Sequence, residues 1–226
     1  MTRLGVISDV HGDVAALADA LTRLDELGVD TVICAGDVVD YGPCPNETIE
    51  LLQREAIACI RGNHERWKLT PTSEGARRFA DEVWLSDSSL AYLAELPVAW
   101  DKRIDGVRVS MRHAQPLSDA KGIFPDQISI DDMRLWLDQV QADVLIVGHT
   151  HLPFEITALG GGSIVNPGAL LRNITDQRYV HKQDRAGGTF GVLELPSLSF
   201  KVYRAATGTE VDLPRWHLGV RDSRAR

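Results

Sequence analysis

Residues 143–151 read "DVLIVGHTH". The four apolar residues from Val144 to Val147 are typical of a buried strand. The strand is followed by a glycine and by two histidines, His149 and His151, separated by one threonine. Two imidazoles at the end of a buried strand must find partners or leave the core. An ordinary turn with two solvated histidines is the alternative, and the rest of the chain decides between them.

Other apolar runs in the chain also end in polar residues that can bind metals. These runs are 3–8 ("RLGVIS"), 31–35 ("TVICA"), 57–60 ("IACI") and 107–112 ("VRVSMR"). The residues that follow them are Asp9 and His11, then Asp37, then Asn63 and His64, and finally His113. Since open α/β sheets carry ligand sites beyond the carboxyl ends of their strands, we expect these side chains to gather there. Residues two apart on an extended segment point the same way, which predicts that each D-x-H or H-x-H pair faces one centre.

The chemistry of this set favours divalent metal ions. Imidazole, carboxylate and amide oxygen suit first-row divalent metals, and the set holds no thiolate that would favour a closed structural zinc site. This many candidate ligands are too many for one ion. A carboxylate placed between two ions could bridge them at ~3.5–4 Å, which is the spacing of two-metal hydrolases. Taken alone, Asp9 and Asp37 could equally cap a helix and a turn.

The N-terminal part of the chain alternates strands with helices. Apolar residues recur at helical spacing over 13–27, with Asp13 as N-cap and Gly28 as C-terminal stop. A second helix is expected over 46–55. The β-α-β-α-β order predicts a sheet with helices packed on its faces. Residues 66–97 read as a helical insertion over that sheet.

The C-terminal part is predicted to form a second sheet, because its strands follow one another with few helices between them. A hairpin joins 98–104 to 107–112 across Asp105-Gly106. After a helix at 129–141, strands are expected at 143–147, 154–158, 163–166, 189–195 and 198–204. One domain over residues 1–204 is expected, followed by a polar, loosely held tail at 205–226.

Composition limits the classes of protein that remain. The chain has 226 residues, is 44% hydrophobic and 25% charged, and carries a formal net charge of −8. That charge argues against a protein that coats nucleic acid or an anionic membrane. No run approaches about 18 apolar residues, so neither a signal peptide nor a membrane span is expected. Cys34, Cys44 and Cys59 lack metal spacing, which favours reduced thiols and a cytoplasmic location.

The ordered motifs resemble those of the calcineurin-like metallophosphoesterase superfamily. They are D-x-H (9–11), GD (36–37), GNHE (62–65), a single His113, and GHTH (148–151). "YGP" (41–43) and "NPG" (166–168) resemble its small bacterial and archaeal phosphodiesterase branch. The resemblance covers roughly residues 3–168. It implies an α/β fold, a four-layer αββα sandwich of two mixed β-sheets flanked by helices.

The resemblance also implies a role for each motif residue. One metal ion would be held by Asp9, His11 and His151, and the other by Asn63, His113 and His149, with Asp37 bridging the two. His64 would stay off the metals as the acid for the leaving group. Arg61 stands where relatives place a phosphate-binding arginine, although it could instead pair with a surface carboxylate. His113 is followed by Ala114 where the family usually has glycine.

The implied reaction is hydrolysis of a phosphate ester by a hydroxide held between two divalent metal ions. Mn²⁺ is the first choice, because nitrogen and oxygen ligands without sulfur accept it, and Fe, Zn or Ni are alternatives. The expected partner is a small anionic phosphoester, a nucleotide or dinucleoside polyphosphate included. A homo-oligomer is compatible with the sequence.

The sequence leaves other substrates and classes open. The family's Ser/Thr protein phosphatases carry GDYVDRG, whereas this chain reads "GDVVDYG", with Tyr41 in place of the arginine. This difference favours phosphodiesters over phosphopeptides. A non-catalytic scaffold, like the retromer subunit of this fold, is the rival class. The basic segment 170–188, with Arg172, Arg178, Lys182 and Arg185, could cover an anionic substrate or be a solvated loop.

Overall fold

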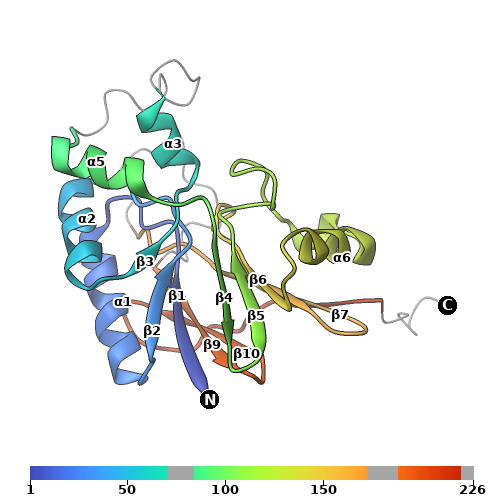
Figure 1. Ribbon diagram of the computed structural model, residues 1–226. Coiled ribbons are helices and arrows are strands. Elements are labelled where there is room, and N and C mark those ends of the chain that lie inside the picture. The colour runs from blue at the N-terminus through green and yellow to red at the C-terminus, as the bar shows by residue number, and fades with distance from the viewer. Residues whose placement is uncertain (71–83, 173–187, 220–226) are drawn as a thin grey trace.

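The computed structural model describes residues 1–70, 84–172 and 188–219, which form two β-sheets packed face to face (Figure 1). The first sheet has the strand order β10-β9-β1-β2-β3. Its strands are β1 (Thr2–Ile7), β2 (Thr31–Cys34), β3 (Ala58–Cys59), β9 (Thr189–Leu195) and β10 (Ser199–Arg204). β1, β2 and β3 are parallel, and β9 and β10 are added in antiparallel fashion beside β1.

The second sheet has the order β11-β7-β8-β6-β5-β4. Its strands are β4 (Trp100–Ile104), β5 (Val107–Met111), β6 (Val144–Ile146), β7 (Pro153–Ala158), β8 (Ser163–Pro167) and β11 (Arg215–Leu218). β5, β6 and β8 are parallel to one another. At the predicted hairpin turn, Asp105 and Gly106 both have positive φ angles, of 48° and 84°, as a type I′ turn requires.

Helices cover the outer face of each sheet. They are α1 (Val14–Glu26), α2 (Pro45–Arg54), α3 (Asn63–Leu69), α5 (Asp87–Glu95) and α6 (Ile130–Gln139), with a 3₁₀ turn at Pro125–Gln127. Figure 1 shows α1, α2, α3 and α5 on the side of the first sheet and α6 on the side of the second. The predicted αββα sandwich is therefore confirmed. Among the described residues, no helix has the length and apolar character needed to cross a membrane.

The apolar core has three parts, and each fills one gap between layers. Val144 and Ile146 lie in the cluster between the two sheets, whereas Leu145 and Val147 lie in the cluster beneath α6. The third cluster joins the first sheet to α1, α2 and α5. A strand that is covered on both faces needs apolar residues at every position. The run 144–147 is uninterrupted for this reason.

Two expectations for the C-terminal part were wrong. The last two predicted strands, β9 and β10, do not join the second sheet but extend the first one, where β9 pairs with β1. Residues after 204 are not all a loosely held tail, because Leu213 is buried and β11 pairs with β7. In the expected insertion over 66–97, α3 begins earlier, at Asn63, α5 follows, and residues 71–83 lie outside the described part.

Candidate metal centre and active site

The metal-ligand candidates lie in turns that directly follow the strands of both sheets. Asp9, His11 and Asp37 have φ angles of 52°, 49° and 52°, and His149 and His151 have 66° and 58°. All five are in the left-handed region, which costs non-glycine residues energy and is concentrated at functional sites. The expectation of extended pairs is therefore wrong. Because these turns are not extended, spacing alone does not fix which centre each side chain faces.

The first group consists of Asp9, His11 and His151. Nε2 of His151 lies 3.2 Å from Nε2 of His11 and 3.3 Å from Oδ1 of Asp9. Nδ1 of His11 lies 2.9 Å from the carbonyl oxygen of Val39, so Nδ1 carries the proton and Nε2 presents a lone pair. Oδ1 of Asp9 is buried and has no hydrogen-bond donor among the described residues. The ligand atoms of the three residues converge on one point, as ligands of a cation do.

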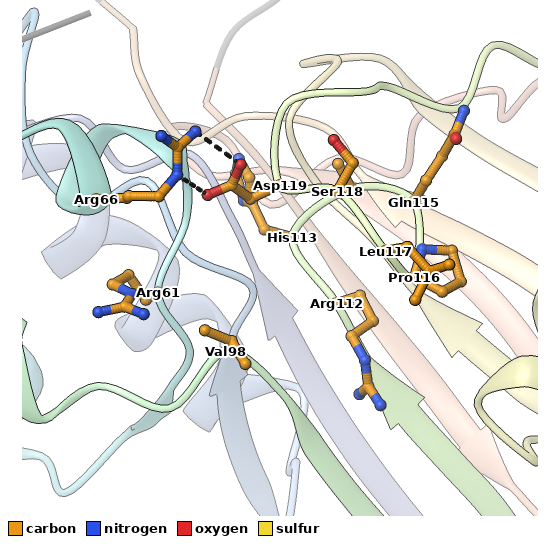
Figure 2. A pocket seen from close by; sticks show the side chains of 11 residues that line it. Arg61, Arg66, Val98, Arg112, His113, Gln115, Pro116, Leu117, Ser118 and Asp119 are labelled. Atoms are coloured by element: carbon orange, nitrogen blue, oxygen red, sulfur yellow. Dashed lines mark hydrogen bonds and ion pairs between the residues drawn. The ribbon is translucent and has the colours of Figure 1, made fainter. Parts of the chain in front are cut away.

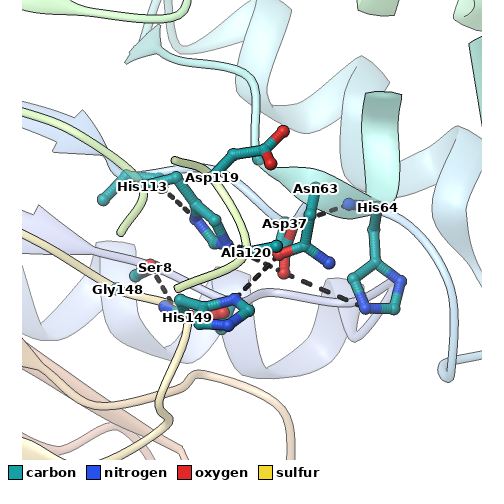
Figure 3. A network of polar contacts seen from close by, with 12 residues as sticks. Ser8, Asp37, Asn63, His64, His113, Asp119, Ala120, Gly148 and His149 are labelled. Atoms are coloured by element: carbon teal, nitrogen blue, oxygen red, sulfur yellow. Dashed lines mark hydrogen bonds and ion pairs between the residues drawn. The ribbon is translucent and has the colours of Figure 1, made fainter. Parts of the chain in front are cut away.

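The second group consists of Asn63, His113 and His149 (Figure 3). Oδ1 of Asn63 lies 3.1 Å from Nε2 of His113 and 2.8 Å from Nδ1 of His149. Nδ1 of His113 donates to the carbonyl oxygen of Ala35 at 2.7 Å, so in the neutral ring that binds a metal Nε2 is the acceptor. The amide oxygen thus faces acceptors, a conflict that turning the amide around would remove. A metal ion among the three atoms would also remove it, with the oxygen left in place.

Asp37 lies between the two groups. Its Oδ2 is 3.0 Å from Nε2 of His113 and 3.9 Å from Nε2 of His11. Its Oδ1 accepts a hydrogen bond from the backbone N–H of His64 at 3.0 Å. One carboxylate therefore faces both groups, as the bridging ligand of a dinuclear centre must.

Electrostatics around Asp37 also fit a cation. Burial would raise the pKa of the Asp37 carboxyl, but His113 and His64 hold it well below its ordinary value. Burial lowers the pKa of His113, yet Asp37 outweighs it and raises that pKa to about 10. The carboxylate thus needs a positive charge beside it. A divalent ion would supply that charge in place of the proton on Nε2.

The donor set fits two divalent ions. Among the described residues, three clusters of ligand atoms lie close enough for one ion each, and two of them are Asp9–His11–His151 and Asp37–His113–His149. The third, His11–Asp37–His64, shares its first two members with the others. All these donors are nitrogen or oxygen, and the three cysteines are free thiols outside the clusters. His149 and His151, neighbours in one motif, contribute to different clusters.

His64 is held from behind by Asp40, a contact that sequence reasoning missed. Nδ1 of His64 lies 2.7 Å from Oδ2 of Asp40, and the other oxygen of Asp40 pairs with Nζ of Lys68 at 2.6 Å. Nε2 of His64 is directed toward the centre, 4.0 Å from Oδ2 of Asp37. Burial lowers the pKa of His64, but Asp37 and Asp40 outweigh it and raise the pKa. The available signal was that Asp40 follows Asp37 by three residues, which does not identify His64 as its partner.

Glu65 organises the turn that carries Asp37. Its buried carboxylate accepts hydrogen bonds from the backbone N–H groups of Asp37, Val38, Val39 and Gly62, at 2.7–3.2 Å. Burial and then Asp37 raise the pKa of Glu65 to about 7, although the backbone donors oppose this. Sequence reasoning had noted Glu65 only as part of the GNHE motif. The structure gives it the task of shaping the 36–39 turn.

The NPG motif supports the GHTH turn. The side-chain amide of Asn166 donates to the carbonyl oxygen of Gly148 at 2.7 Å, and its oxygen accepts from the backbone N–H of Gly168 at 2.8 Å. Gly148 packs against Ser8 and Asp9 so closely that a Cβ would clash with the Ser8 hydroxyl. The two motifs therefore fix the distance between the sheets at the centre.

Two basic residues that the sequence singled out make contacts of other kinds. Arg61 lines a neighbouring cavity, and its backbone N–H donates to the carbonyl oxygen of Pro97 at 2.7 Å. Arg172, from the basic segment 170–188, pairs with Asp19 at 2.7 Å and with Asp13 at 3.6 Å. Arg178, Lys182 and Arg185 lie outside the described residues.

The fold is a two-sheet sandwich, and the converging ligands form a candidate metal centre where strands of both sheets end. The sequence matches the calcineurin-like phosphoesterase superfamily domain over residues 2–188. The chain belongs to this superfamily.

Two curated relatives show how far this likeness extends in sequence. An uncharacterized protein of Methanocaldococcus jannaschii is 29% identical over 189 residues, which cover 78% of this chain and 73% of that protein. Serine/threonine-protein phosphatase 2 of Escherichia coli is 26% identical over 170 residues, 64% of this chain and 78% of the phosphatase.

Solved structures share the fold over nearly the whole chain. A hypothetical protein of Pyrococcus horikoshii has a TM-score of 0.71 and 21% identity, covering 90% of this chain and 88% of its own. A metallophosphoesterase of Sphaerobacter thermophilus has a TM-score of 0.67 and 23% identity, with 94% and 89% covered. Vps29 of Entamoeba histolytica, crystallised with Zn²⁺, has a TM-score of 0.55 and 18% identity, with 93% and 96% covered.

Proposed function

We propose that the chain is a dinuclear metal-dependent phosphoesterase that acts on small phosphodiesters, with nucleotides and dinucleoside polyphosphates as further candidate substrates. The observation that carries this proposal is the position of Asp37, whose carboxylate faces two separate groups of ligand atoms. Asp9, His11 and His151 would hold one ion, and Asn63, His113 and His149 the other. Mn²⁺ is the first metal to test, with Fe, Zn and Ni as alternatives.

When bound, two such ions supply a nucleophilic hydroxide at neutral pH and neutralise charge on the phosphoryl oxygens. The chain's own contribution to proton transfer is His64. Its Nδ1 is fixed by Asp40, so Nε2 is the nitrogen that gives its proton to the leaving oxygen. Asp40 and Lys68 hold the ring in position, and the carboxylates of Asp37 and Asp40 favour its protonated form.

The charges near the centre support a diester rather than a monoester. A phosphate monoester carries more negative charge than a diester and needs more cationic partners. Tyr41, where the protein phosphatases have arginine, packs its ring against His11 at 4.7 Å and His64 at 5.2 Å between centroids. Lys68 pairs with Asp40, and Arg61 lines the neighbouring cavity. These features support a monoanionic diester phosphate at the reacting position.

The alternatives are a Ser/Thr-type protein phosphatase and a non-catalytic, protein-binding scaffold. The first corresponds to the Escherichia coli relative and the second to the fold shared with Vps29. Filled ligand positions in both clusters support an enzyme over a scaffold.

The test combines metal loading with a substrate panel. Protein stripped with chelator is reloaded with Mn²⁺ and assayed on a nitrophenyl diester, cyclic nucleotides, a dinucleoside polyphosphate and a phosphoserine peptide. Two ions per chain and faster turnover of diesters are expected. Preference for the phosphopeptide at matched concentration would favour the protein phosphatase, and full activity after complete chelation would refute the metal mechanism. Two bound ions with no hydrolysis would favour the scaffold.

A further inference from the structure

A cavity of about 460 Å³ opens beside the metal centre, with His113 in the wall that the two share. Its lining includes three arginines, Arg61, Arg66 and Arg112, in a chain whose formal net charge is −8. Figure 2 shows Arg61 and Val98 on one side and Pro116 and Leu117 on the other. The cavity therefore combines cationic and apolar surfaces next to the reacting position.

Two of the three guanidinium groups already have carboxylate partners. Arg66 donates to both oxygens of Asp119, at 2.5 and 2.8 Å, and Arg112 donates to Asp101 at 2.9 and 3.2 Å. The guanidinium of Arg61 makes no hydrogen bond or ion pair with any residue that the structure describes. Its charge is the one that remains for an external anion, and guanidinium recognises phosphate with paired hydrogen bonds.

The apolar part of the lining is unusually exposed. Val98 is 59% and Leu117 is 86% exposed, and both border this cavity. Ligand pockets typically combine such apolar surface with a few polar groups that fix orientation. A sugar or a nucleobase would cover Val98 and Leu117, while its phosphate paired with Arg61.

The position of Arg61 along the chain limits the distance between its backbone and the metal centre. It precedes Asn63, a ligand of the centre, by two residues, which span at most about 7 Å of backbone. His113 belongs both to a ligand cluster and to the wall of this cavity, so an anion held there by Arg61 would lie beside the metal centre. A nucleotide with phosphates on its 3′ and 5′ oxygens separates two anions by one sugar, a distance of the same order.

We propose that this cavity is a subsite for a second phosphate group of the substrate, held by Arg61, with the attached organic group against Val98 and Leu117. The inference rests on the proposed phosphodiesterase function and narrows its substrates to diesters with a second anionic phosphate. The reacting phosphate stays at the metal centre.

The experiment compares two esters that have the same leaving group. One is the 5′-nitrophenyl ester of thymidine 5′-phosphate, and the other carries an additional phosphate on its 3′ oxygen. In the wild-type protein the second ester should have the higher kcat/KM. Arg61→Gln should remove this preference, lowering kcat/KM for the second ester roughly tenfold or more beyond any loss on the first. Arg134→Gln, an equal charge change on α6, serves as the control and should preserve the preference.

Other outcomes separate this inference from the proposed function. Equal losses on both esters would assign Arg61 to the reacting phosphate and overturn the subsite, and no loss on either would also overturn it. If neither ester is hydrolysed, the proposed function fails. Binding then decides the subsite, because thymidine 3′,5′-bisphosphate should bind more tightly than thymidine 5′-phosphate in an Arg61-dependent manner. Melting temperatures of the variants check that each one is folded.

Discussion

At the scale of single residues, the position of Asp37 predicts how its substitution changes metal binding, because its carboxylate faces both ligand clusters. Asp37→Asn keeps the shape of the side chain and removes the charge that the two ions would share. We expect both ions to weaken by more than the roughly 10–100-fold that changes outside the ligand shell cost. Metal content after dialysis should fall from near two ions per chain toward none.

Two further variants serve as comparison and control for the metal content of Asp37→Asn. His149→Ala removes a ligand from one cluster alone and should leave about one ion per chain. Asp126→Asn, at an exposed acid in the 3₁₀ turn, should leave metal content unchanged. Loss of a single ion in Asp37→Asn would contradict a bridging role.

His64 gives a second prediction, because a general acid matters most when the leaving oxygen is basic. Nitrophenolate leaves without a proton, whereas an alkoxide does not. His64→Ala should therefore lose ~10²–10⁴-fold in kcat on an alkyl diester and far less on a nitrophenyl diester. Asp40→Asn should show the same pattern more weakly, since it disturbs the ring's orientation.

The metal content of His64→Ala decides between two roles. His64, His11 and Asp37 form a cluster that could itself hold an ion. If His64 is the acid, the variant keeps both ions. Loss of an ion would instead place His64 among the ligands, and equal activity losses on both esters would assign it to positioning.

The ligand residues could be found in the sequence because strand ends in an α/β sheet meet at one edge. Their supports were harder to find. Asp40 and Lys68 act on His64 through a turn with positive φ at Asp40, and nothing in the local sequence specifies that path. Glu65 could be recognised as part of the GNHE motif. Its four backbone hydrogen-bond donors, at Gly62 and 37–39, could be identified only from the structure.

At the scale of elements, the turn after β2 depends on Glu65, and this dependence can be measured. Glu65→Gln replaces one accepting oxygen with a donor that faces backbone N–H groups. Hydrogen bonds to charged groups contribute about 1.5–3 kcal/mol, so the free energy of unfolding should fall by about that much. Urea unfolding measures it, with Glu47→Gln, at an exposed position of α2, as the control. A change no larger than that of the control would mean that the turn holds without Glu65.

The helices and most strands were predictable because their periodicity and end signals are local. Asp13 accepts from the backbone N–H of Ala16, and Gly28 adopts the positive φ expected of a C-terminal stop. Pairing partners are not local. The sequences of β9 and β10 have the pattern of strands, but they do not indicate that β9 pairs with β1. The four-residue β11 is too short for a strand pattern to be recognised.

At the scale of the whole molecule, each of the two proposed metal sites joins the two sheets. Asp9 and His11 follow β1 of the first sheet, and His151 follows β6 of the second. In the other cluster Asp37 follows β2, whereas His113 and His149 follow strands of the second sheet. A bound ion therefore ties one sheet to the other at the edge where their strands end.

This arrangement predicts that metal binding stabilises the entire fold. A ligand that binds only the folded state adds about 2.7 kcal/mol when present at 100 times its dissociation constant. For a domain of this size that corresponds to a rise in Tm of roughly 5–10 °C for each ion. Calorimetric scans with excess Mn²⁺ and with chelator measure the shift. Asp37→Asn should lose most of it, because neither ion would remain bound, whereas His149→Ala should keep about half. An identical Tm with and without metal would show that the sheets are held together by their apolar interface alone.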